Sequence, residues 1–127
     1  MANELILIVE DNAHNRKLAR DLLRVHGYRT VEAETGEDGV ALAGEHAPDL
    51  IVMDIHLPGM SGIEALTRLR AAPATRAIPV IACTASVMPQ DRSDIIAAGF
   101  DAFVSKPVNL EAFLGAVSAA LTKRVAS

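Results

Sequence analysis

Polar side chains follow several apolar runs of this sequence, at positions where side chains from different strands could act together. They are Glu10 and Asp11 near the start of the chain, Asp54 in its middle, and Thr84 and Lys106 in its second half. Each of them alone is typical of a helix cap, a turn or a solvated loop end. The combination of acids with a hydroxyl and an ammonium group is what indicates chemistry.

The three acids would repel one another if the segments before them are neighbouring strands. Two unit charges about 4 Å apart repel by roughly 4 kcal/mol at an effective dielectric constant near 20. A cation is therefore expected between Glu10, Asp11 and Asp54. A few hard carboxylate oxygens, with positions left open for water and a phosphoryl oxygen, favour Mg²⁺ over a softer metal. No cluster of Cys and His residues offers a competing metal site.

The same residues supply the parts that phosphoryl transfer needs. That reaction requires a nucleophile held in line, a metal and fixed donors on the phosphoryl oxygens, because position and charge stabilise its transition state. A carboxylate such as Asp54 can act as the nucleophile and form an aspartyl phosphate. Thr84 and Lys106 can supply the donors. The sequence therefore predicts a magnesium-dependent phosphoryl acceptor that is phosphorylated on Asp54.

The elements that must position these residues follow from the alternation of apolar runs with helical patterns, which predicts five βα units around a parallel sheet. The predicted strands are Leu5–Val9, Arg29–Ala33, Leu50–Met53, Val80–Cys83 and Ala102–Ser105. Most are rich in Val, Ile and Leu, as in strands covered on both faces, but Arg29–Ala33 alternates and is predicted at an exposed edge. Ligands of such sheets bind at the carboxyl ends of the strands.

Punctuation residues mark the predicted helices. Gly27 and Gly99 are predicted to end the first and fourth helices, and Pro89 suits the first turn of the fourth. Asn109 is predicted to cap the last helix. The apolar stripe of that helix is predicted to face the core and consists of Leu110, Phe113, Leu114, Val117 and Leu121.

Length and composition limit the class of protein. The 127 residues, 50% of them hydrophobic, predict one domain over residues 1–127 with no output domain attached. The net charge of −4 and the absence of a basic stripe argue against binding to nucleic acid. The apolar stretch near the N-terminus is too short for a signal peptide or a membrane span, so we expect a cytoplasmic protein without membrane contact.

Four segments together resemble the receiver domain of bacterial response regulators. They are Val9–Asn12, Met53–Gly62, Cys83–Ala85 and Ser105–Pro107, and the resemblance extends over about residues 4–122. The run from Val9 to Leu18 and the lack of an output domain are similar to the single-domain regulators of the DivK type.

The resemblance implies an α/β fold, a doubly wound five-stranded parallel sheet in the order 2-1-3-4-5 with five helices. It implies that Asp54 accepts the phosphoryl group. Asp11, Asp54 and the backbone carbonyl of His56 would bind Mg²⁺ directly, with Glu10 acting through water. Thr84 and Lys106 would bind the phosphoryl oxygens.

The resemblance also implies partners and switch residues. The donor would be a histidine kinase or a histidine phosphotransferase, and a downstream protein would bind the face built from the fourth helix, fifth strand and fifth helix. Thr84 and Phe103 would form the switch, although many receivers have a Tyr where this chain has Phe103. His56 and Ser86 occupy positions that tune the loss of phosphate, or are ordinary loop residues.

Other interpretations share parts of the pattern. A phosphatase of the haloacid dehalogenase type wants a second Asp where this chain has His56. A flavodoxin-like FMN carrier needs donors in its first loop, where Glu10 and Asp11 would repel a phosphate. A receiver domain from a hybrid histidine kinase has the same chemistry and stays open as an alternative. We expect a phosphoacceptor signalling protein rather than an enzyme.

Overall fold

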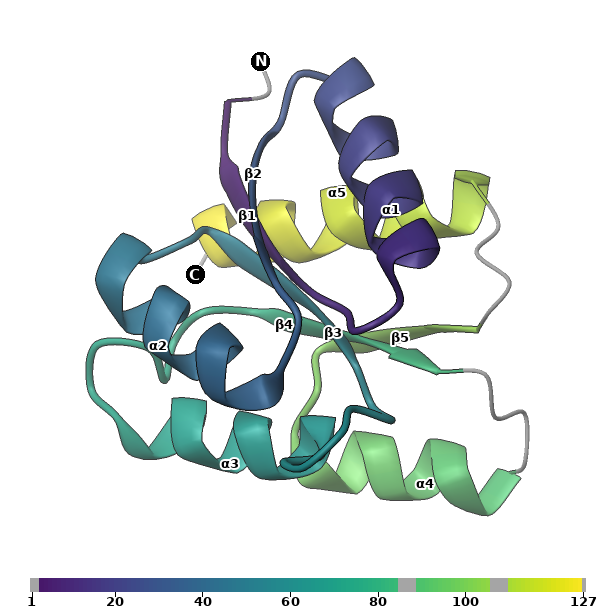
Figure 1. Cartoon of the computed structure of the whole chain (residues 1–127). Coiled ribbons are helices and arrows are strands. Elements are labelled where there is room, and N and C mark those ends of the chain that lie inside the picture. The colour runs from purple at the N-terminus through teal and green to yellow at the C-terminus, as the bar shows by residue number, and fades with distance from the viewer. Residues whose placement is uncertain (1–2, 85–88, 106–109, 127) are drawn as a thin grey trace.

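The computed structural model describes residues 3–84, 89–105 and 110–126 and alternates five strands with five helices (Figure 1). The elements are β1 (Leu5–Val9), α1 (Ala13–Val25), β2 (Arg29–Ala33), α2 (Gly36–His46), β3 (Leu50–Asp54), α3 (Gly62–Ala71), β4 (Val80–Thr84), α4 (Pro89–Ala98), β5 (Ala102–Ser105) and α5 (Leu110–Ala126). All five predicted strands are confirmed, with β3 and β4 each one residue longer than predicted.

The five strands form one parallel sheet in the order β2-β1-β3-β4-β5, which confirms the predicted topology. The strand order reverses between β1 and β3, because β2 lies on one side of β1 and β3 on the other. In open α/β sheets the crevice at this point faces the carboxyl ends of the strands. The fold thus places the ends of β1 and β3 at the position where ligands bind.

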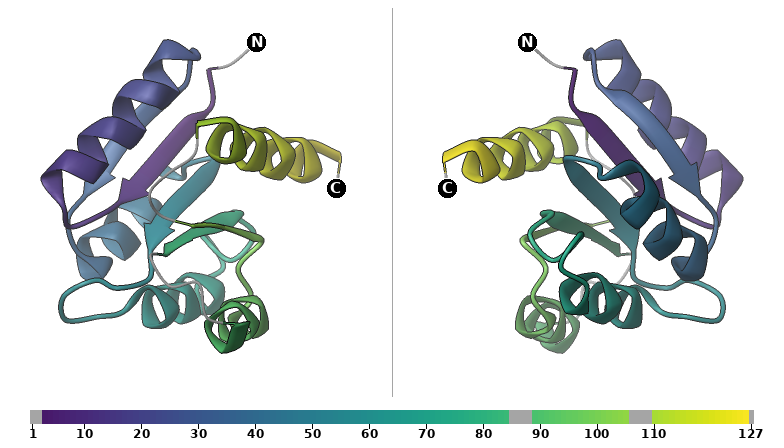
Figure 2. Two further views of the ribbon diagram at one scale, coloured as in Figure 1. Left: turned by 90° about the vertical axis from the view of Figure 1, so that its right-hand side faces the viewer. Right: turned by 90° about the vertical axis from the view of Figure 1, so that its left-hand side faces the viewer.

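Helices cover both faces of the sheet (Figures 1 and 2). The helices α1 and α5 lie on one face, and α2, α3 and α4 lie on the other. Each face has its own buried cluster: Leu23 of α1 and Phe113 of α5 belong to one, whereas Leu66 of α3 and Ile95 of α4 belong to the other. The strands β3 and β4 are buried along their whole length, while β2 is partly exposed, as predicted for an edge strand.

The ends of the helices agree with the sequence punctuation where the structure describes them. Gly27 and Gly99 have positive φ angles of 90° and 106° just after α1 and α4, and Pro89 is the first residue of α4. In α5 the predicted stripe is confirmed at Phe113, Val117 and Leu121, which are buried, with Leu114 packed against the same cluster. Asn109 and the side chain of Leu110 lie outside the described residues.

Two aspartates close strand ends at the amino edge of the sheet. Asp49, just before β3, accepts a hydrogen bond of 2.9 Å from the amide of Leu5 in the neighbouring β1. Asp101, just before β5, accepts one of 2.8 Å from the amide of Val80 in the neighbouring β4. Each carboxylate thus satisfies a backbone donor that the strand ladder would leave unpaired.

None of the helices in the described part of the chain is long and apolar enough to cross a membrane.

Candidate functional site

The pairing of β1 with β3 brings the three predicted acids together. Val9 lies opposite Met53 in the register of the two strands, so that the next residues, Glu10 and Asp54, are neighbours at the carboxyl edge. The three acids can each offer a carboxylate oxygen within 4.8 Å of the others. In the described residues no other group of three His, Cys, Asp or Glu side chains is placed closely enough to hold a metal.

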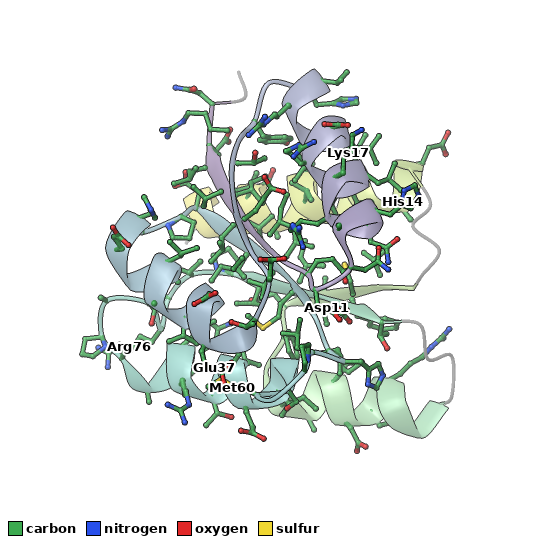
Figure 3. The ribbon with its side chains drawn as sticks, in the orientation of Figure 1. Asp11, His14, Lys17, Glu37, Met60 and Arg76 are labelled. Carbon is green, nitrogen blue, oxygen red and sulfur yellow. The ribbon has the colours of Figure 1, made fainter. Side chains whose placement is uncertain are left out.

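The acids differ in burial, and this difference fits a metal site that is open on one side. Glu10 and Asp54 are each only 6% exposed, whereas Asp11 is exposed at the start of α1 (Figure 3). Partly buried carboxylates repel each other more strongly than solvated ones, because less water screens them. Oxygen donors alone, some buried and one open to solvent, suit a hard divalent cation such as Mg²⁺.

Glu10 is held by its own loop and by α1. Its side chain accepts a hydrogen bond of 3.2 Å from the amide of Asn12, and its backbone carbonyl accepts one of 2.9 Å from the guanidinium of Arg16. Arg16 also pairs with Glu32 at 3.6 Å and with Glu34 at 3.5 Å. The positive charge of Arg16 is therefore shared with acids at the end of β2, and its hydrogen bond to Glu10 positions the backbone of the acidic loop.

Asp54 is held by the loop that follows it. The amide of His56 donates a hydrogen bond of 3.1 Å to Oδ1 of Asp54. The chain then returns, and the amide of Gly62 donates a hydrogen bond of 3.0 Å to the carbonyl of Ile55. A Cβ atom at Gly62 would collide with the carbonyl oxygen of Asp54 and would lie 2.9 Å from the Cα atom of Ile55. The first turn of α3 can approach Asp54 this closely only because residue 62 has no side chain.

Thr84 ends the strand next to Asp54. In the register of β3 and β4, Asp54 lies opposite Cys83, one residue before Thr84. Thr84 is 1% exposed and lines a small cavity of about 140 Å³ between the β3–α3 loop and α4, together with His56 and Asp94. Its hydroxyl group therefore belongs to the same edge of the sheet as the three acids.

The structure thus brings together Glu10, Asp11, Asp54, His56 and Thr84. Phe103, in β5, is half-buried and packs against the cluster on the α2–α4 face. The predicted phosphoryl-binding Lys106 and the position Ser86 lie outside the described residues. A buried Asp at the carboxyl edge of a parallel sheet, among further acids, is consistent with a site for Mg²⁺ and a phosphorylated aspartate.

Comparison with known proteins decides the family. A model of the response regulator receiver domain matches residues 6–118. The chain belongs to this family. As a receiver domain it is a signalling protein and not a conventional enzyme, so neither the haloacid dehalogenase interpretation nor that of an FMN carrier holds.

Several relatives support the assignment of the receiver domain. The chain is 43% identical over 116 residues to the polar-differentiation response regulator DivK of Brucella ovis, a match that covers 91% of this chain and 94% of DivK. Its fold matches a putative response regulator from Chloroflexus aurantiacus with a TM-score of 0.90, at 26% identity over 94% of this chain and 98% of the other. The receiver domain of the sensor histidine kinase PA1611 from Pseudomonas aeruginosa, which was solved with a magnesium ion coordinated in its active site cleft, matches with a TM-score of 0.84, at 32% identity over 99% of this chain and all of the other.

The sequence alone did not predict a role for two residues that shape the site, Gly62 and Arg16. Gly62 lies within the Met53–Gly62 segment, but its function as the contact point of α3 with Asp54 appears only when the loop is folded. Arg16 lies in α1, and its partners Glu32 and Glu34 are distant in sequence, so no spacing rule identifies it. The signal that could have suggested Arg16 is its place about one helical turn after the acidic pair, from where a long side chain can reach back and bind the backbone of the acidic loop.

Proposed function

We propose that this receiver domain accepts a phosphoryl group on Asp54 from a histidine kinase or a histidine phosphotransferase, in a reaction that depends on Mg²⁺. The observation that carries the proposal is the convergence of the Glu10, Asp11 and Asp54 carboxylates within 4.8 Å at the carboxyl edge of the sheet. Three acids at this spacing repel one another, and a bound cation would offset that repulsion. The magnesium ion in the related receiver domain of PA1611 supports the same choice of metal here.

In this proposal each residue has a distinct part. Asp11, Asp54 and the backbone carbonyl of His56 would hold Mg²⁺, and Glu10 would act on it through water. Bound there, the metal would neutralise charge on the phosphoryl oxygens. Thr84 and Lys106 would bind the remaining phosphoryl oxygens, and the side chains of His56 and Ser86 would set the lifetime of the phosphate.

In the transfer itself Asp54 would act as the nucleophile, while the metal and the donors stabilise the charge on the phosphoryl oxygens. A carboxylate oxygen of Asp54 attacks the phosphorus of the donor's phosphohistidine. As the new P–O bond forms, the P–N bond breaks, and the imidazole leaves with the electron pair and then takes up a proton. The hydrogen bond from the His56 amide to Oδ1 fixes the plane of the Asp54 carboxylate, so that less rotational freedom is lost at the moment of attack.

Phosphorylation would be read by a downstream protein at the surface built from α4, β5 and α5, with Thr84 and Phe103 as the switch. The phosphoryl group would bring charge and strong acceptors to the hydroxyl group of Thr84. Thr84 ends β4, which lies between β3 with Asp54 and β5 with Phe103. A shift of Thr84 would therefore alter the space beside Phe103. We further propose that the protein acts in the cytoplasm, where ATP charges histidine kinases.

The experiment that tests the proposal is labelling of Asp54→Asn by a phosphorylated histidine kinase or by acetyl phosphate. The wild-type protein is expected to acquire an acid-stable, base-labile label that requires Mg²⁺, and the variant is expected to acquire none. Asp38→Asn, at an exposed acid in the first turn of α2, is the matched control and should label normally. Full labelling of Asp54→Asn in a folded protein would overturn the assignment.

A further inference from the structure

Arg92 of α4 lies over the aromatic ring of Phe103 in β5. Its guanidinium carbon Cζ is 5.4 Å from the centroid of the ring. Cations within about 6 Å of a ring centroid are attracted by the negative face of the ring, and arginine makes such contacts more often than lysine. The contact connects a helix and a strand of the α4–β5–α5 face.

The ring of Phe103 also contacts the protein core. Side chains alternate along β5, so Phe103 packs against the cluster on the α2–α4 face, while its neighbour Val104 belongs to the cluster on the opposite face. Ile95, three residues after Arg92 in α4, is 3% exposed and belongs to the cluster that Phe103 contacts. The position of the ring therefore depends on α4 through both Arg92 and Ile95.

The ring is the partner that the structure gives to the charge of Arg92. Arg16, Arg20 and Arg70 each pair with a carboxylate. Arg92 makes no ion pair with the side chains that the structure describes, and its own side chain is exposed. An arginine that lies over a ring in place of a carboxylate can release that ring without leaving a buried charge unpaired.

We propose that Arg92 is a positioning residue that restrains Phe103 in its half-buried resting position and so sets the resting balance of the switch. The inference rests on the proposed function, which makes Phe103 part of the phosphorylation response. A cation–π contact at an exposed site is weak, so its loss changes a two-state population by about two- to fivefold. Such a restraint keeps the resting form dominant, yet the binding of a phosphoryl group can overcome it.

The test uses ¹⁹F NMR of the whole protein labelled with fluorophenylalanine. The chain has three Phe residues, so Phe103 gives one of three signals, and the buried Phe100 and Phe113 are internal references. Spectra are recorded with Mg²⁺ alone and with beryllofluoride, which mimics the phosphoryl group. The variants are Arg92→Gln, which removes the cation, and Arg92→Lys, which retains it. Arg68→Gln, at an exposed arginine of α3, is the matched control.

The expected result concerns the Phe103 signal with Mg²⁺ alone. In Arg92→Gln it should move toward the beryllofluoride position, as for a population ratio changed about two- to fivefold. Arg92→Lys should move it less, and Arg68→Gln should leave it in place. The inference is overturned if Arg92→Gln leaves the signal at the wild-type position, or if beryllofluoride shifts the amides near Asp54 but not Phe103. If beryllofluoride shifts neither those amides nor Phe103 in the wild type, the proposed function itself fails.

Discussion

The backbone amide of His56 donates its hydrogen to Oδ1 of Asp54 across 3.1 Å. His56 therefore orients the Asp54 carboxylate through its main chain, while its imidazole is exposed. Orientation of Asp54 and the proposed tuning by His56 are consequently separable properties of one residue. In the proposed reaction the backbone of His56 would set the geometry for transfer, and its side chain would be available to act on the phosphorylated product.

This separation predicts the behaviour of His56→Ala. Because the amide is retained and the side chain is exposed, the rate at which Asp54 is labelled should stay within about twofold of wild type. Changes should be confined to the rate at which the label is lost. Pulse labelling followed by a chase measures both rates in one experiment. A large fall in the labelling rate would mean that the imidazole takes part in the transfer.

Removal of Asp11 should weaken the proposed metal site without unfolding the protein, because Asp11 is exposed. Addition of Mg²⁺ to the wild type should shift the amide signals of residues 10–12 and 54–57, and Asp11→Ala should need a much higher Mg²⁺ concentration for the same shifts. NMR is the suitable method, since the chain has no Trp whose fluorescence could report on the site. Shifts in other parts of the protein only would contradict the proposed site.

Gly62→Ala should harm both stability and phosphorylation. The added Cβ would meet the carbonyl of Asp54 and the Cα atom of Ile55, and these backbone atoms cannot turn away as a flexible side chain could. We expect a loss of about 1–3 kcal/mol in the free energy of unfolding, as for overpacked sites. Urea denaturation measures it. The labelling rate of Asp54 in the folded variant should also fall, and an unchanged rate would show that α3 does not position this residue.

Two glycines of α2 offer a matched pair for alanine substitution. A Cβ at Gly39 would lie 2.7 Å from Cγ2 of the buried Val9, whereas one at Gly44 would meet no heavy atom within 4 Å. Gly44→Ala should raise the free energy of unfolding by about 0.5–1 kcal/mol, the usual gain within a helix. Gly39→Ala should instead lower it by about 1–3 kcal/mol. Equal effects of the two substitutions would mean that α2 can shift away from β1.

Asp101→Ala should destabilise the protein more than the loss of an ordinary surface ion pair. Asp101 accepts hydrogen bonds from the amide of Val80 and from the guanidinium of Arg70, and that arginine also donates to the carbonyls of Arg76 and Ile78. We expect Asp101→Ala to lower the free energy of unfolding by about 1–2 kcal/mol. For comparison, Asp21→Ala, which removes an exposed pair with Arg20, should destabilise the protein less than Asp101→Ala does. Thermal or urea unfolding of the two variants distinguishes these values.

The sequence predicted the strands and the acidic pocket for a clear physical reason. Strands buried on both faces must be apolar along their length, so the first polar residue after each run marks its end, as at Asp54. What it could not predict depends on contacts in space. The closeness of Gly62 to Asp54 follows from where a seven-residue loop returns, and the partners of Arg92 and Arg16 lie on other elements. Side-chain types indicate such contacts only after the topology is known.

The hydrogen bonds of Asp49 and Asp101 make the amino edge of the sheet different from its carboxyl edge. At the amino edge each carboxylate ties an incoming segment to the first amide of a neighbouring strand, Leu5 in β1 and Val80 in β4. The amino ends of β1 and β4 are thus restrained by side chains, and the acidic pocket lies at the opposite, carboxyl edge of the sheet. If phosphorylation moves Thr84, we therefore expect the carboxyl end of β4 to move more than its amino end, where the Asp101 carboxylate holds the amide of Val80.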